Sequence, residues 1–307
     1  MRLLDISRTE QSTSPVFIVG EARSGTSILY RILQKHPAFR PRKLNLWESR
    51  IMRCSERAAS FRPEDHRTLR GYMAGDDERY NAFLESIAPL RPLFAAGELM
   101  LRLVPERFRS SVWFASGHAL VVRSYFHHAR EARGVRRVLE KTPNQVGYVR
   151  QLLRCYPKAR LIYIHRHPVD VYTSYVRRAQ VDPKAASWAR LTPSTFAARW
   201  AENTTLALNA KTRAPRSFLM LRYEDLTENP EATVRSLCEF LGEPFDPDMI
   251  RERKPRVGLR KADPHLFGEL TATTKDWRDY ICPEDAAALQ KRLEPIMARL
   301  SYQPYEW

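Results

Sequence analysis

Short apolar runs alternate with helical patterns along this chain. Four apolar runs predict buried strands, at 16–19, 138–139, 161–164 and 218–221. Apolar residues at helical spacing follow them, most clearly at 144–156, 194–212, 229–242 and 283–300. Because strands that alternate with helices form parallel sheets covered by helices, the pattern predicts an α/β fold with a central parallel sheet.

Residues 50–134 depart from this alternation. They are charged, rich in arginine and aromatic residues, and contain no convincing strand. Helical spacing is clearest at 80–87 and 119–133. We therefore expect one α/β domain over 1–307, with 50–134 as a helical insertion after the first core strand and helix. Insertions on such scaffolds commonly shape the substrate site; a helical cap without ligand contact is the alternative.

Residues 20–27 carry the strongest chemical signal. The run Val16–Val19 enters Gly20-Glu21-Ala22-Arg23-Ser24-Gly25, and Thr26-Ser27 open a helix. A strand, a glycine loop and a helix N-terminus together hold an anionic group on backbone N–H donors. The spacing is that of a P-loop, G-x-x-x-x-G-K-[ST], except that Thr26 stands at the lysine position. The loop is thus poorly equipped for ATP with magnesium, yet suited to another phosphorylated nucleotide.

A second phosphate-binding segment is predicted within 158–178. The apolar run 161–164 ends at His165-Arg166-His167, and Pro168 starts a helix, whose first turn favours proline. Arg166 and Ser174 bracket this junction, and the arginine fork suits a phosphate group. Two such segments suit a nucleotide that is phosphorylated at two places.

The two motifs, in this order, resemble those of the sulfotransferase family, whose donor is 3′-phosphoadenosine 5′-phosphosulfate (PAPS). The resemblance spans about residues 15–48 and 138–301. It implies transfer of a sulfuryl group from PAPS to a hydroxyl, less often an amine, with release of 3′-phosphoadenosine 5′-phosphate (PAP). By this resemblance the residues that bind the 5′ phosphosulfate are Arg23, Ser24, Gly25, Thr26 and Ser27, and those that bind the 3′ phosphate are Arg166 and Ser174. A C-terminal basic residue is also implied at the 3′ phosphate, with Lys275, Arg260 and Lys261 as candidates.

The resemblance also implies catalytic groups. Glu48 follows the helix end at His36-Pro37, as the general base does in protein-tyrosine-type and bacterial sulfotransferases. Lys141 lies at a strand end, where a lysine of those enzymes touches the transferring sulfuryl group. Arg23 is expected to reach the same group from the loop.

Other assignments of the base stay open. Glu48 could instead be a surface residue paired with Arg50, and burial against Trp47 would favour its catalytic role by raising its pKa. Glu21 is the rival carboxylate, and His118 is the histidine kept in reserve. Glu224 and Asp225, in L-R-Y-E-D, are predicted to start a helix rather than to act in catalysis.

Composition bears on which partners, metals and cellular compartment we expect. The formal net charge of +16 suits attraction of an anionic donor or acceptor, or reflects a generic arginine-rich surface. No nucleic-acid-binding motif is present, and the four cysteines lack metal-ligand spacing, so we expect reduced cysteines, no metal and no nucleic-acid partner. The polar N-terminus and the lack of a membrane-length apolar run favour a cytoplasmic enzyme, and we expect a bacterial one.

Two other classes of protein compete with this hypothesis. A P-loop kinase or NTPase is the runner-up, but it should carry a lysine where Thr26 stands. A basic binding module would explain the net charge but neither phosphate-binding segment. The acceptor is expected to be a hydroxyl-bearing small molecule, glycan or lipid, and the insertion 50–134 is expected to shape its site.

Overall fold

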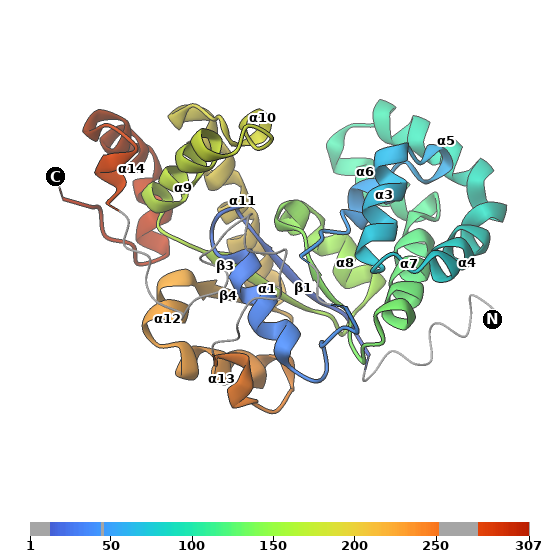
Figure 1. Ribbon diagram of the computed structural model, residues 1–307. Helices are drawn as coiled ribbons and strands as arrows, with labels where there is room; N and C mark the ends of the chain where they lie inside the picture. The colour runs from blue at the N-terminus through green and yellow to red at the C-terminus, as the bar shows by residue number, and fades with distance from the viewer. Residues whose placement is uncertain (1–12, 44–45, 252–275, 307) are drawn as a thin grey trace. The chain divides into compact units, whose positions relative to one another are not determined.

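The computed structural model describes residues 13–43, 46–251 and 276–306 (Figure 1). The chain divides into two compact units. Unit 1 comprises Met1–Ile18 and Leu29–Leu161, and unit 2 comprises Val19–Ile28 and Ile162–Trp307. The expected single domain over 1–307 stays a prediction.

Four strands form one sheet in the order β2-β1-β3-β4. Their bounds are Val16–Gly20 for β1, Leu139–Lys141 for β2, Arg160–His165 for β3 and Phe218–Arg222 for β4. β1 and β2 are parallel, with Val16 opposite Leu139 and Ile18 opposite Lys141. Every residue of β1 is buried, as expected for a strand of a covered parallel sheet. The predicted α/β fold with a central parallel sheet is confirmed.

Unit 1 contains the predicted helical insertion. The described residues between 46 and 134 form helices and no strand, which confirms its helical character. These helices are α2 Ile51–Ser55, α3 Pro63–Tyr72, α4 Asp77–Ile87, α5 Arg91–Leu103, α6 Glu106–Ala115 and α7 His118–Arg133. In Figure 1, α4 lies along α7 and α5 packs against α6. Buried aromatic residues such as Tyr72, Phe83 and Tyr125 fill the space between these helices. A short 3₁₀ segment, Pro143–Tyr148, and α8, Val149–Cys155, follow β2.

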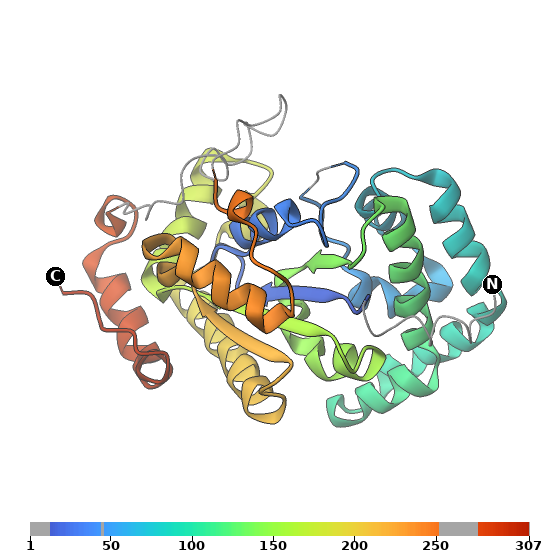
Figure 2. The same ribbon diagram turned by 90° about the horizontal axis from the view of Figure 1, so that it is seen from below.

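Unit 2 is built from the helices that follow β3 and β4. These are α9 Pro168–Val181, α10 Ala186–Ala189, α11 Pro193–Arg213, α12 Tyr223–Glu228, α13 Pro230–Leu241 and α14 Pro283–Arg299. α14 packs on α9 and α11 around a buried cluster that includes Tyr172, Phe196 and Trp200. α12 and α13 follow β4 directly and pack on each other (orange in Figure 2). The helix after the loop at 20–25, α1 Thr26–Lys35, begins in unit 2 and ends in unit 1.

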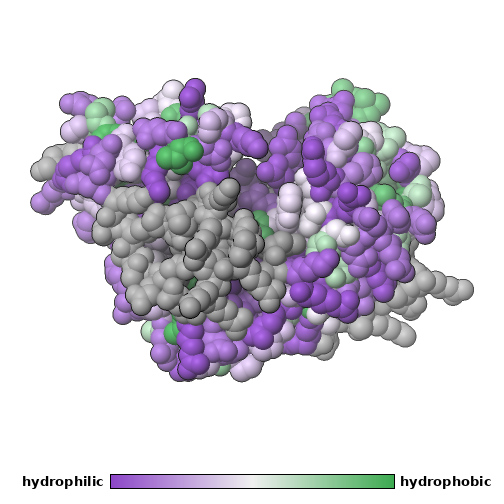
Figure 3. Space-filling model, in the orientation of Figure 1, coloured by the Kyte–Doolittle hydropathy of each residue, from purple (hydrophilic) through white to green (hydrophobic). Residues whose placement is uncertain are grey.

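The described surface is mainly hydrophilic in the view of Figure 3, and hydrophobic residues gather over the α5–α6 region. Leu99, Met100, Leu103 and Phe108 are exposed there. Across the ranges the structure describes, none of the helices combines the length and the apolar composition that crossing a membrane requires.

Candidate phosphate-binding and catalytic residues

Two glycines let the loop at 20–25 lie close to its neighbours in unit 2. Gly20 ends β1 with φ 153°, and Gly25 precedes α1 with φ 100°. A Cβ atom on Gly20 would lie 2.5 Å from the carbonyl oxygen of Ile164, and one on Gly25 would collide with the ring of Tyr223. Both positions therefore require glycine, for the close approach as well as for the backbone angle.

Arg23 joins the loop to the second predicted phosphate-binding segment. Its backbone is left-handed, with φ 74°, and its Nε donates to Ser174 Oγ on α9 at 3.0 Å. A left-handed residue other than glycine costs roughly 1–2 kcal/mol, so the contacts of the loop must stabilise this conformation. The two segments that the sequence predicted to bind opposite ends of one nucleotide thus meet within unit 2.

Two buried polar atoms of these segments are left unsatisfied. Ser24 is fully buried, and its Oγ has no hydrogen-bond partner among the described residues. Arg166 Nε likewise lacks a partner in the described part of the chain. Leaving such a group unsatisfied costs about 1–3 kcal/mol. An anionic ligand that accepts from both groups would remove this cost.

Arg166 is held at the junction of β3 and α9. One of its terminal nitrogens contacts Asp170 at 3.4 Å, and its guanidinium carbon lies 4.5 Å from the centroid of the Tyr223 ring. Tyr223 therefore contacts both Arg166 and Gly25, one from each segment. It opens α12, whose first turn holds Glu224 and Asp225, as predicted for helix-starting carboxylates.

The histidines that flank Arg166 are packing residues. His165 Nδ1 shares a hydrogen bond with the Tyr302 hydroxyl at 2.9 Å, and the His167 ring stacks on Tyr305 with centroids 3.9 Å apart. Burial lowers the pKa of both histidines to about 4, so both are neutral at pH 7.

Glu21 is a buried carboxylate at the base of the loop. Only 1% of it is exposed, and three side chains of unit 2 donate to it. They are the Tyr175 hydroxyl at 2.6 Å, an Arg199 terminal nitrogen at 2.7 Å and Asn203 Nδ2 at 2.7 Å. This set, named here the Glu21 cluster, was missed from the sequence. Arg199 and Asn203 lie one helical turn apart on α11, but nothing local marks Glu21 as their common partner.

In unit 1, Glu48 and Lys141 form a short ion pair. Lys141 Nζ lies 2.7 Å from Glu48 Oε1, and Arg50 Nε lies 3.7 Å from Glu48 Oε2. The Lys141 side chain is 5% exposed and that of Glu48 is 27% exposed. The structure thus brings two predicted catalytic residues together and also forms the pair with Arg50. The Trp47 ring lies against Gly71 and is half exposed.

Glu140 fixes the backbone next to Glu48. Its Oε1 accepts from the Ser49 N–H at 3.3 Å and from the Thr142 hydroxyl, and Thr142 Oγ1 accepts from the Arg50 N–H at 3.3 Å. Arg50 itself is left-handed, with φ 50°. Complete burial raises the pKa of Glu140. β2 therefore anchors the turn that carries Glu48 through the neighbours of Lys141.

The remaining candidates are placed as follows. His118 is fully buried against Phe94 and Trp113, and burial lowers its pKa to about 4. Lys275, Arg260 and Lys261 lie outside the described residues. In the described ranges, no group of three or more His, Cys, Asp or Glu side chains could hold a metal ion.

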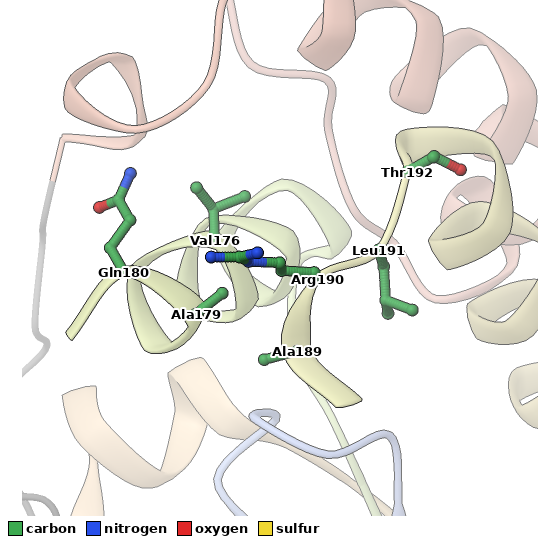
Figure 4. Close-up of a pocket in the computed structure, with 7 residues that line it drawn as sticks. All are labelled: Val176, Ala179, Gln180, Ala189, Arg190, Leu191 and Thr192. Atoms are coloured by element: carbon green, nitrogen blue, oxygen red, sulfur yellow. The ribbon is translucent and has the colours of Figure 1, made fainter. Parts of the chain in front are cut away.

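A pocket of about 460 Å³ lies beside α9 (Figure 4). Its lining residues come from α9, α10 and the link to α11, and they are Val176, Ala179, Gln180, Ala189, Arg190, Leu191 and Thr192. Arg190 extends toward α9 in this view. None of the predicted site residues lines this pocket, although Val176 belongs to the segment 158–178.

The strand, loop and helix at 16–35, on a parallel sheet covered by helices, place this chain in the class of P-loop-like α/β proteins. The model of the sulfotransferase family matches residues 15–247. The chain therefore belongs to the sulfotransferase family.

Similar proteins were found among curated sequences and solved structures. The omega-hydroxy-beta-dihydromenaquinone-9 sulfotransferase Stf3 of Mycobacterium bovis is 25% identical over 77% of this chain and 65% of its own length. Sulfotransferase 2A1 of Macaca fascicularis is 22% identical over 49% of this chain and 60% of its own length. This chain thus spans less than two thirds of either relative. The sulfotransferase domain from the curacin biosynthetic pathway matches with a TM-score of 0.60 and 19% identity, over 95% of this chain and 99% of that domain; this likeness concerns the fold.

Proposed function

We propose that the protein transfers a sulfuryl group from PAPS to a hydroxyl group of an acceptor and releases PAP. The observation that carries the proposal is the meeting of the two phosphate-binding segments in unit 2. Arg23 contacts Ser174 at 3.0 Å, while Ser24 Oγ and Arg166 Nε are buried donors without partners among the described residues. A nucleotide with phosphates at both its 5′ and 3′ positions would satisfy these groups. Membership of the sulfotransferase family supports the same donor.

The donor-binding roles follow from the chemistry of each group. We assign the 5′ phosphosulfate to the loop and the N-terminus of α1, where backbone N–H groups and the helix dipole favour an anion. The loop residues in this role are Arg23, Ser24, Gly25, Thr26 and Ser27. We assign the 3′ phosphate to Arg166 and Ser174, with Lys275 as a further candidate.

We assign the proton transfer to Glu48. In the reaction the acceptor hydroxyl gives its proton to the Glu48 carboxylate, its oxygen bonds to sulfur, and the bond from sulfur to the 5′ phosphate oxygen breaks. Lys141, held at 2.7 Å from Glu48, would stabilise the negative charge of the transferring sulfuryl group. Arg23 would do the same from the loop. Glu21 is a weaker candidate base, because three donors already occupy its carboxylate.

The acceptor is proposed to be a hydroxyl-bearing small molecule, glycan or lipid. The name of the Mycobacterium bovis relative includes an omega-hydroxy quinone, which supports a hydroxyl acceptor. We propose that the helical insertion at 50–134 shapes the acceptor site. A kinase or NTPase is disfavoured by Thr26 at the lysine position of the loop.

Binding of PAP without a divalent metal tests the proposal. At a PAP concentration 100-fold above Kd, a ligand that binds only the folded state stabilises it by about 2.7 kcal/mol. We therefore expect a clear rise in melting temperature with PAP and EDTA, and a smaller rise with ATP and magnesium. A shift with ATP and magnesium alone would indicate a kinase or NTPase, and no shift with either would reject the assignment of a nucleotide donor.

A further inference from the structure

The Glu21 cluster and the Arg23–Ser174 contact join the same two segments. Ser174 and Tyr175 are consecutive on α9; Ser174 accepts from Arg23, and Tyr175 donates to Glu21. Glu21 and Arg23 are two residues apart in the loop. The loop is therefore tied to α9 at two adjacent points. Arg23 and Ser174 belong to the residues assigned to the nucleotide, and Glu21 and Tyr175 do not.

The Glu21 contact ties the loop to two helices. Its carboxylate is buried, and α9 and α11 both donate to it. The Arg199 guanidinium carbon also lies 5.0 Å from the centroid of the Tyr175 ring, which holds that ring in place. Charge-assisted hydrogen bonds are shorter and stronger than neutral ones, and a buried carboxylate is costly without them. The loop thus cannot move away from α9 without removing one of the three donors to this buried carboxylate.

We propose that Glu21 and Tyr175 are positioning residues that set the spacing between the two phosphate-binding segments, and so determine selectivity for a nucleotide with phosphates on both its 3′ and 5′ positions. The inference rests on the proposed function. Two subsites hold one ligand more tightly than either alone only if their spacing matches the ligand. The Glu21 cluster supplies that spacing without touching the nucleotide.

A pair of conservative variants on one helix tests this role. Tyr175→Phe removes the hydroxyl that donates to Glu21 and keeps the ring that packs against Arg199. Tyr172→Phe is the matched control, because its hydroxyl donates one bond at 3.0 Å to the Leu191 carbonyl oxygen and does not contact the loop. Calorimetry with PAP, 5′-AMP and 3′-AMP then measures binding to both subsites together and to each alone.

For Tyr175→Phe we expect the Kd for PAP to rise about tenfold. The Kd for 5′-AMP and the Kd for 3′-AMP should each change by less than about twofold. Tyr172→Phe should leave all three affinities unchanged. An equal loss for PAP and both monophosphates, or no loss for PAP, would overturn the positioning role. Wild-type protein that binds PAP no more tightly than the monophosphates would also overturn it, whereas wild-type protein that binds no PAP at all would reject the proposed function itself.

Discussion

At the scale of single residues, Glu48 shows what a local motif can and cannot reveal. The sequence predicted Glu48 from its place after His36-Pro37, and it also allowed a pair with Arg50. The structure forms that pair at 3.7 Å, but adds a closer contact with Lys141, which is 93 residues away. Such a contact depends on the bonds from the backbone of Ser49 and Arg50 to Glu140 and Thr142, which are far apart from them in the chain and are not encoded locally.

Replacing Glu48 by Gln should slow turnover and spare donor binding. The amide keeps the shape of the side chain and removes its basicity, so turnover should fall by about 10²–10⁴, the usual contribution of general-base catalysis. Single-turnover rates with labelled PAPS measure this, using an acceptor found by screening hydroxyl compounds. Glu64→Gln, at an exposed position of the same unit, is the control. Near-normal turnover would make Glu48 a surface ion-pair residue.

At the scale of elements, proline marked the helix starts that the sequence predicted well. α9, α13 and α14 begin at Pro168, Pro230 and Pro283, because the first turn of a helix does not need the missing N–H. The prediction was poorer from 144 onward, where the structure has a 3₁₀ segment before α8. The insertion was predicted to be helical as a whole, but α5 and α6 were not predicted as separate helices. Apolar residues such as Leu103 face solvent there, so the apolar positions do not mark one buried face.

The junction of β3 and α9 gives the second prediction. Arg166→Ala should weaken PAP binding, because a hydrogen bond to a charged group contributes about 1.5–3 kcal/mol. The affinity for adenosine 5′-phosphosulfate should change little, since that ligand lacks the 3′ phosphate. Calorimetry with both nucleotides is the measurement. Equal losses for the two would mean that Arg166 supports the fold, through Tyr223 and Asp170, rather than the 3′ phosphate.

At the scale of the whole molecule, buried histidines link stability to pH. His118 lies in unit 1 and His165 and His167 lie in unit 2, and burial lowers the pKa of each from 6.5 to about 4. The unfolded chain therefore takes up protons below pH 6.5 that the native protein excludes until about pH 4. The free energy of unfolding should fall as the pH drops through this window. Glu140 acts in the opposite sense, because burial raises its pKa.

His118→Phe should flatten this dependence. Each histidine contributes on the order of 1–2 kcal/mol to the loss of stability between pH 7 and pH 5. Phe keeps an aromatic ring beside Phe94 and Trp113 and cannot take up a proton. Urea unfolding at both pH values should show a smaller shift of the midpoint for the variant than for the wild type. The same shift in both proteins would show that His118 is already exposed to protons in the native state.

The Glu21 cluster also bears on how this chain reaches its native state. Glu21 is 154 residues from Tyr175 and 182 from Asn203, and the chain between them builds unit 1 before it returns at Ile162. Contacts that close such long loops form late and slow folding, since chain entropy is lost before they contribute. During synthesis the loop is made early, yet its partners on α9 and α11 follow only after all of unit 1. We therefore expect nucleotide binding to appear as the last and slowest phase of refolding.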